Sequence, residues 1–295
     1  MNEVLSATNR AIWRDYLELC KPNVVALMLL TSVIGMLLSV PGKVPLDVML
    51  FGNLGIATLA GAAAVINHLV DRRVDTKMAR TYNRPVAQGR ISPVNAAIFA
   101  ATLATAGFLT LYFLINPVTA WLTISASVGY AFVYTFFLKR ATPQNIVIGG
   151  LAGAAPPLLG WTAATGEIHG HALLLVLIIF AWTPPHFWAL AIHRRKEYAN
   201  ADIPMLPVTH GEHYTKIHTL LYTVILLVVS MLPYVTHMLG WIYLLGAVVL
   251  GVGYLYFVFV LLVTKKANAG MDAFWYSIVY LMCLFAAMLL DHYLV

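Results

Sequence analysis

Charged residues are scarce in this chain of 295 residues. Asp, Glu, Lys and Arg together make up 10% of it, whereas they make up about a quarter of a typical soluble domain. Hydrophobic residues reach 61%, and the mean hydropathy is +0.81. This scarcity of charge excludes an ordinary soluble fold and indicates an integral membrane protein.

Cysteine is scarce as well. Cys20 and Cys283 are the two cysteines, they lie near opposite ends of the sequence, and neither is part of a CxxC pair. A disulfide framework and a thiolate metal site are therefore not indicated. The residues before the first long apolar run include acids and lack a small-residue cleavage site, so we expect neither a signal peptide nor a transit peptide.

Long apolar runs are abundant. A transmembrane helix needs about 20 predominantly apolar residues to cross roughly 30 Å of hydrocarbon, and nine runs satisfy this requirement. The sequence therefore predicts an all-α, polytopic membrane protein with nine transmembrane helices, at residues 22–40, 47–70, 93–115, 117–138, 145–164, 171–192, 217–237, 239–263 and 273–292.

Basic residues are distributed unevenly between the connections. With these nine spans, 17 of the 18 Lys and Arg residues lie on one side of the membrane, and Lys43 lies on the other. Because basic residues collect on the untranslocated side, the N-terminus is predicted inside and the C-terminus outside. This distribution explains the net charge of +6 without nucleic acid as a partner. We expect a bacterial cytoplasmic membrane, because a mitochondrial protein would carry a longer presequence.

An acidic face is predicted at the end of the second span. Asn67, Asp71 and Asp75 are four residues apart, so they share one face if the helix continues through them. Two neighbouring carboxylates repel unless a cation neutralises them, and Arg72 and Arg73 fall mostly off this face. We therefore expect a divalent metal site and a phosphorylated substrate. The alternative is an interfacial salt bridge, which leaves the spacing unexplained.

A second acidic segment follows the sixth span. Glu197, Tyr198 and Asp202 lie in a long polar connection on the same basic side, and Glu197 and Asp202 are candidate metal ligands there. Glu197 follows Asp71 by 126 residues. This layout suggests a single domain of two related halves, residues 1–140 and 141–295. Identity between the halves is too weak to establish a repeat.

A diphosphate leaving group would need more positive charge than a metal alone provides. Magnesium held by a few carboxylates and several waters can bridge phosphate oxygens. Arg84, Arg73, Lys139 and Arg140 can donate charge-assisted hydrogen bonds to the same group. The alternative is that these residues only follow the positive-inside rule.

Several motifs resemble a known family. Asn67-xxx-Asp71-xxx-Asp75 followed by Arg84 and a proline resembles the first signature of the UbiA superfamily of intramembrane prenyltransferases. Residues 134–157, 182–191 and 204–211 resemble the branch of that superfamily that uses haem b. The resemblance covers the chain from the first span to the ninth, and its motifs are long.

The resemblance implies a nine-helix bundle around a central cavity, with a polyprenyl diphosphate donor, magnesium, and haem b as acceptor. It implies transfer of a farnesyl group to a haem vinyl group, with addition of water. Many superfamily members have Asp-xxx-Asp in the second loop, whereas here Asp202 stands five residues after Glu197. This departure leaves the ligands of the second site open. Supply of haem to a terminal oxidase rests on the resemblance alone.

His186 is the candidate for the haem site, since it follows two prolines inside the sixth span, where prolines often shape a cavity. A buried imidazole there can ligate haem iron, although a histidine satisfied by hydrogen bonds within the bundle is equally consistent. Trp182, Trp188 and Asn145 are further candidates for the haem cavity, with ordinary packing as the alternative for the tryptophans. Gly149, Gly150 and Gly153 are expected to permit close helix packing, and Pro156 and Pro157 to break the fifth helix.

Two other functions stay open. A related prenyltransferase acting on an aromatic acid or a quinone precursor would share the acidic motifs. Residues 182–191 argue against this alternative. A transporter or a non-catalytic haem-binding protein is the third possibility, and both acidic segments lying at one face rather than at mid-membrane argue against it.

Overall fold

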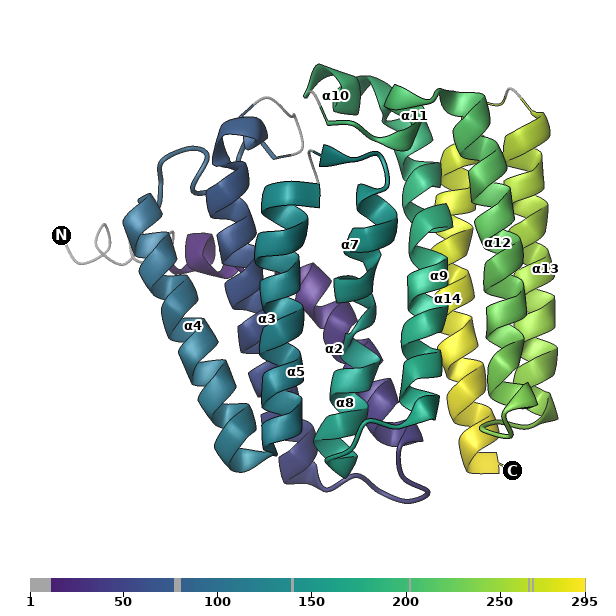
Figure 1. The fold of residues 1–295 in the computed structure, drawn as a ribbon, viewed down its shortest axis with the longest axis horizontal. Coiled ribbons are helices and arrows are strands. Elements are labelled where there is room, and N and C mark those ends of the chain that lie inside the picture. Colours follow the sequence, from purple (N-terminus) through teal and green to yellow (C-terminus); the bar gives the residue numbers. More distant parts are fainter. Residues whose placement is uncertain are drawn as a thin grey trace, which may run out of the picture.

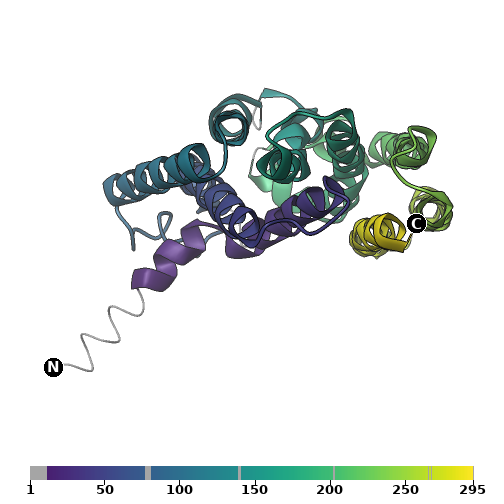
Figure 2. The same cartoon turned by 90° about the horizontal axis from the view of Figure 1, so that it is seen from below.

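The computed structural model describes residues 12–76, 81–138, 141–201, 203–264, 266 and 268–294. Within these residues the regular structure is helical, and long helices lie side by side as in a membrane bundle (Figure 1). Figure 2 gives the end-on view, with α12, α13 and α14 grouped at one end and α4 at the other.

Eight helical segments of the described chain are long and apolar enough to cross a membrane, and a bent helix pair makes a ninth. The predicted all-α membrane fold is thus confirmed. The segments are α3 (Leu46–Asp75), α4 (Pro93–Leu114), α5 (Pro117–Val128) with η1 (Gly129–Leu138), α7 (Asn145–Ala154) with α8 (Pro156–Thr165), α9 (Gly170–His193), α12 (Glu212–Val235), α13 (Trp241–Val263) and α14 (Ala269–Leu294).

The bent pair consists of the helix Ile12–Leu19 and α2 (Pro22–Leu38), with an angle of 48° between them. Lys21, in the break, has the left-handed backbone angles φ 52° and ψ 60°. The proline that follows disfavours the helical region for Lys21 and then starts α2 as its first residue. The bend brings the Lys21 side chain to α3.

Helices α7 and α8 together form one span with a break at its middle. Helix α7 ends at Ala154, and Pro156 and Pro157 start α8, as the sequence predicts. Proline fits the first turn of a helix but not its interior. In α9, by contrast, Pro184 and Pro185 lie inside a continuous helix.

Glycine permits the close crossing of α2 and α8. A Cβ atom on Gly160 would lie 1.9 Å from the backbone oxygen of Ser32, and one on Gly35 would lie 2.1 Å from that of Pro157. Only residues without a side chain fit this contact. On α7, a Cβ on Gly149 would lie 2.2 Å from Tyr134, so the packing role predicted for that glycine is supported.

The connections separate into two groups. The segment after α3 and the short helices α10 (Arg195–Asn200) and α11 (Leu206–Thr209) lie at the upper edge of Figure 1, whereas the α2–α3 connection and the C-terminus lie at the lower edge. The basic residues of α10 and of the end of α3 are therefore at one edge, and Lys43 is at the other.

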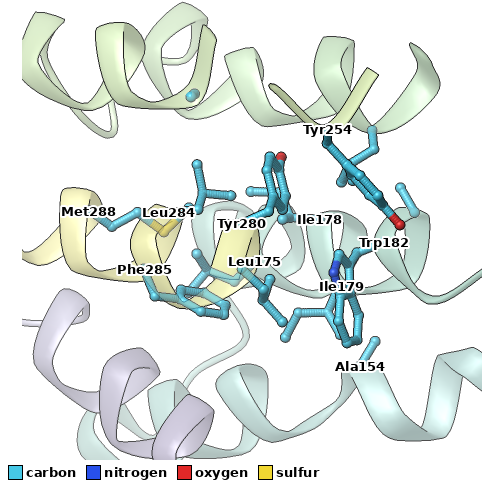
Figure 3. Packing of buried hydrophobic residues seen from close by; sticks show 14 of the residues in the cluster. Ala154, Leu175, Ile178, Ile179, Trp182, Tyr254, Tyr280, Leu284, Phe285 and Met288 are labelled. Atoms are coloured by element: carbon cyan, nitrogen blue, oxygen red, sulfur yellow. The ribbon is translucent and has the colours of Figure 1, made fainter. Parts of the chain in front are cut away.

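The largest apolar core joins α9 to α12, α13 and α14. Tyr254, Tyr280 and Phe285 are fully or almost fully buried there, and Figure 3 shows Trp182 of α9 beside Tyr254 of α13. This core fixes α9 against α14, and thereby positions the histidine site described below.

Candidate functional site

The predicted acidic face is present. Helix α3 continues to Asp75, so Asn67, Asp71 and Asp75 lie at successive turns of one helix. All three are buried, with exposed fractions of 4%, 1% and 3%. Arg72 and Arg73 are exposed instead. Because burial of carboxylates without compensating charge is costly, this face requires partners from other helices.

Asn67 connects three elements. Its amide nitrogen donates to Asp71 Oδ2 at 3.0 Å and to Thr135 Oγ1 of η1 at 3.3 Å. Its amide oxygen accepts from Lys21 Nζ at 2.5 Å. Thr135 Oγ1 donates in turn to the backbone oxygen of Tyr130 at 2.9 Å. Asn67 therefore fixes the bend before α2, helix α3 and the π-helix relative to one another.

Asp75 has a different partner. Arg84 Nη1 lies 2.8 Å from both carboxylate oxygens of Asp75, and the Arg84 side chain is 18% exposed. Thr81 Oγ1 donates to the Asp75 backbone oxygen at 3.2 Å. The two buried acids are thus accompanied by two cations, Lys21 and Arg84, which lowers the cost of their burial.

These side chains fit a magnesium ion. Carboxylate and amide oxygens are hard donors, and Mg²⁺ is commonly held by one or two carboxylates, waters and substrate phosphates. Among the described residues, no three His, Cys, Asp or Glu side chains are close enough to form a complete protein cage. A metal held by Asn67, Asp71 and Asp75 would therefore need oxygen ligands from water or a phosphorylated substrate.

Glu197, the described acid of the second segment, is not gathered onto this face. The Glu197 side chain is 46% exposed and lies 3.8 Å from Arg194, the residue that precedes the short helix α10. Asp202, Lys139 and Arg140 lie outside the described residues.

Tyr198 connects the second segment to the first. It is buried in a cluster with Trp188 and Ile146, against which Val74 of α3 packs. Tyr134 stacks on Tyr130 with ring centroids 5.6 Å apart. Aromatic rings of η1 and α10 therefore lie next to the acidic face.

His186 and Trp182 form the candidate haem site together. The imidazole of His186 stacks between Trp182 and Phe274, with ring centroids 4.1 Å and 4.5 Å apart. Its Nδ1 atom lies 2.6 Å from Ser277 Oγ. Trp188 is not part of this group, since it is fully buried against Tyr222 of α12. Asn145, at the start of α7, is also fully buried.

Three residues of the acidic site are absent from the sequence prediction. Lys21 and Thr135 reach Asn67 from other helices, and no local pattern indicates this. His68 could have been found, because it precedes Asp71 by three residues and so lies next to it on a helix. Its side chain is 2% exposed, its ring nitrogens have no hydrogen-bond partner within the described chain, and Lys21 and Arg84 are within electrostatic range.

Comparison with known proteins shows which proteins this chain resembles. The chain is 71% identical over 296 residues to the protoheme IX farnesyltransferase of Saccharophagus degradans, covering 100% of this chain and 98% of that protein. A solved structure of digeranylgeranylglyceryl phosphate synthase has the same fold, with a TM-score of 0.82, 18% identity and coverage of 96% and 99%.

A UbiA homolog from Archaeoglobus fulgidus, solved with GPP and Mg²⁺, matches with a TM-score of 0.67 and 17% identity, covering 93% of this chain and 99% of that one. The model of the UbiA prenyltransferase family matches residues 28–289, which is most of the sequence. The chain therefore belongs to the UbiA prenyltransferase family.

Proposed function

We propose that the protein transfers a farnesyl group from farnesyl diphosphate to a vinyl group of haem b, with addition of water. The products are haem O and diphosphate. The observation that carries this proposal is the 71% identity, over the whole chain, to a protoheme IX farnesyltransferase. The buried acidic face and the histidine site on α9 supply the two sets of side chains that the reaction needs.

The donor diphosphate binds at the acidic face. Asn67, Asp71 and Asp75 would hold magnesium, and Glu197 and Asp202 of the second loop are proposed as further ligands. A bound magnesium would neutralise the phosphate oxygens and make diphosphate a better leaving group. The homolog from Archaeoglobus fulgidus was solved with both GPP and Mg²⁺, which supports magnesium in this chain.

Before the donor binds, Arg84 donates hydrogen bonds to both carboxylate oxygens of Asp75. With Asp75 engaged by the metal, the planar guanidinium of Arg84 would be available to donate paired hydrogen bonds to the diphosphate. Lys139 and Arg140 are proposed to bind the same phosphates from the end of η1. The cations thus exchange a carboxylate partner for a phosphate partner.

The allylic group must be kept from water when its bond to oxygen weakens. Tyr130 and Tyr134 of η1 stack on each other, and Thr135 of the same helix contacts Asn67 of the acidic face. Tyr198 belongs to the cluster against which Val74 of α3 packs. Aromatic ring faces attract a nearby cation, and a wall of such rings excludes water. We propose that these tyrosine rings stabilise the positive charge that develops at C1 of the farnesyl group.

The acceptor binds near α9. His186 and Trp182 line the proposed haem site, with Asn145 as a further candidate, whereas Trp188 faces α12 and is left out. The vinyl group attacks C1 of the farnesyl group as the C1–O bond to diphosphate breaks, and water adds to the cation that forms next to the porphyrin and releases one proton, which leaves a hydroxyl group. Diphosphate leaves toward the basic edge of the bundle.

The protein is a multi-pass membrane protein. We propose that it lies in a bacterial cytoplasmic membrane, with the N-terminus and both acidic segments in the cytoplasm and the C-terminus outside. Bacterial relatives and the grouping of cations at the edge that holds α10 support this orientation.

The test compares acceptors. The purified protein is incubated with farnesyl diphosphate and magnesium, and release of diphosphate is measured with haem b or with an aromatic acid as acceptor. We expect release with haem b only. Release with the aromatic acid only would make the chain a different UbiA prenyltransferase, and no release with either would favour a binding or transport role.

A further inference from the structure

His186 is held on three sides. Trp182 and Phe274 cover the two faces of its ring at interplanar angles of 20° and 26°. Trp182 is itself fixed, because its indole nitrogen donates to the backbone oxygen of Ser277 at 2.8 Å. The Nδ1 edge meets Ser277 Oγ at 2.6 Å. The imidazole therefore has a fixed orientation, with Nδ1 toward α14 and Nε2 on the opposite edge of the ring.

The position of one proton decides what His186 can do. Ser277 Oγ lies 2.6 Å from His186 Nδ1 and 2.6 Å from the backbone oxygen of Phe274. A serine hydroxyl has a single hydrogen, and a carbonyl oxygen can only accept. If that hydrogen pointed at His186, the two oxygens would face each other at 2.6 Å without a proton between them. The hydroxyl therefore donates to Phe274 and accepts from His186.

It follows that Nδ1 carries the imidazole proton and that Nε2 has a free lone pair. A neutral histidine with an unprotonated Nε2 is the form that ligates a metal, and its other nitrogen is usually hydrogen-bonded to a second group that sets this tautomer. A histidine that served packing alone would need no defined tautomer.

The depth of His186 suits an acceptor that is bound beside the donor. It precedes the end of α9 at His193 by seven residues, or about 10 Å at 1.5 Å per residue. On α3, Asp71 and Asn67 precede the end of the helix at Asp75 by four and eight residues. His186 and the acidic face therefore lie at comparable distances along their helices from the same edge of the bundle.

We propose that Ser277 is a positioning residue that holds His186 in the Nδ1–H tautomer, so that Nε2 binds the haem iron as an axial ligand. This inference rests on the proposed function, because it takes haem b as the acceptor. Ser277 itself does not touch the haem. It fixes the porphyrin through His186 so that one vinyl group is presented to the farnesyl donor.

The experiment uses the purified full chain with ¹⁵N-labelled histidine, and compares the wild type with Ser277→Ala, Ser277→Thr and His186→Gln. Without haem, the His186 signal, assigned by its loss in His186→Gln, is expected to show the Nδ1–H tautomer in the wild type. It should become a mixture in Ser277→Ala and return in Ser277→Thr, which keeps the hydroxyl.

Haem b is then added, and its visible absorption spectrum and affinity are measured. Ser277→Ala is expected to weaken binding by about tenfold to a hundredfold, the usual effect of losing a group that orients a metal ligand. His186→Gln should lose the spectrum of histidine ligation. Ser230→Ala is the matched control, because Ser230 is a buried serine of α12 whose hydroxyl contacts Tyr280 and not His186.

An Nε2–H tautomer in the wild type would overturn the inference, and so would an unchanged haem spectrum in His186→Gln. An equal loss of haem affinity in Ser230→Ala would also overturn it, since the effect would then be general loosening. Farnesyl transfer is measured in the same samples. A wild type that prenylates haem while these tests fail refutes only the role of His186 and Ser277, whereas a wild type that forms no prenylated haem refutes the proposed function.

Discussion

Asp75 and Arg84 provide a test that separates structure from chemistry. Arg84 Nη1 lies 2.8 Å from both oxygens of Asp75, and the two side chains are 4% and 18% exposed. Asp75→Asn keeps the shape of the side chain and removes its charge. Asp75→Asn therefore leaves Arg84 as a largely buried cation without its carboxylate. Arg84→Gln leaves Asp75 as a buried carboxylate without its cation.

The expected loss of stability follows from the burial of the two side chains. Removing one partner of a buried pair costs about 3–5 kcal/mol, because the remaining charge is uncompensated. Arg84 is partly exposed, so we expect about 3 kcal/mol for each single change. In the double variant no charge is left unpaired, and its destabilisation should fall short of the sum by about 1–3 kcal/mol. The exposed pair Arg90–Asp15 is the control, with an expected coupling of about 1 kcal/mol or less.

The free energy of unfolding is measured in mixed micelles, and diphosphate release is measured on the same samples. We expect the double variant to recover stability but not activity, because the amide that replaces the Asp75 carboxylate is a neutral and weaker ligand for magnesium. A coupling as small as that of the exposed pair would refute the buried ion pair. Restored activity in the double variant would show that the reaction needs neither the Asp75 carboxylate nor the Arg84 guanidinium.

Three further outcomes are expected. His68→Leu should raise the KM for farnesyl diphosphate, because it removes the imidazole next to Asp71 on α3. It should not lower stability, because a buried imidazole without a hydrogen-bond partner costs about 1–3 kcal/mol. Lower stability with an unchanged KM would make His68 a packing residue. Gly160→Ala should destabilise the protein by about 1–3 kcal/mol or more, since its Cβ would meet Ser32 at 1.9 Å, while Gly153→Ala, with nothing within 4 Å, should be tolerated; equal effects on thermal unfolding would contradict the α2–α8 contact. EDTA should stop diphosphate release and added Mg²⁺ should restore it; release that is insensitive to EDTA would exclude the metal.

The spans and the acidic face were predictable because their signals are local. Long apolar runs mark membrane helices by length alone, and the spacing of Asn67, Asp71 and Asp75 requires only that one helix continue. Pro156 and Pro157 likewise break the fifth span through their own backbone. The division into two related halves stays a prediction.

The partners of the acidic face were not predictable in this way. Lys21 and Thr135 reach Asn67 across 46 and 68 residues of sequence, so their contacts depend on how the helices pack. The short helices α10 and α11 also gave no signal, because polar segments of this length have no apolar period. Prolines could not place the side chain of His186, which the packing of α9 on α14 decides.

The sequence alone could have predicted that Trp182 and Trp188 point in different directions. Six residues on a helix of 3.6 residues per turn differ by about 120° around the axis, so one helix cannot direct both tryptophans to one cavity wall. Trp182 and His186, four residues apart, do share a face. The structure accordingly stacks Trp182 on His186 and turns Trp188 toward α12.

The most direct test of the account is the mass of the haem recovered after incubation of the purified protein with haem b, farnesyl diphosphate and magnesium. We predict a more hydrophobic haem that is heavier by one farnesyl group and one hydroxyl, and its absence with Asp71→Asn, a variant expected to insert normally. Recovery of unmodified haem b from the wild type, or equal product from Asp71→Asn, would contradict the account.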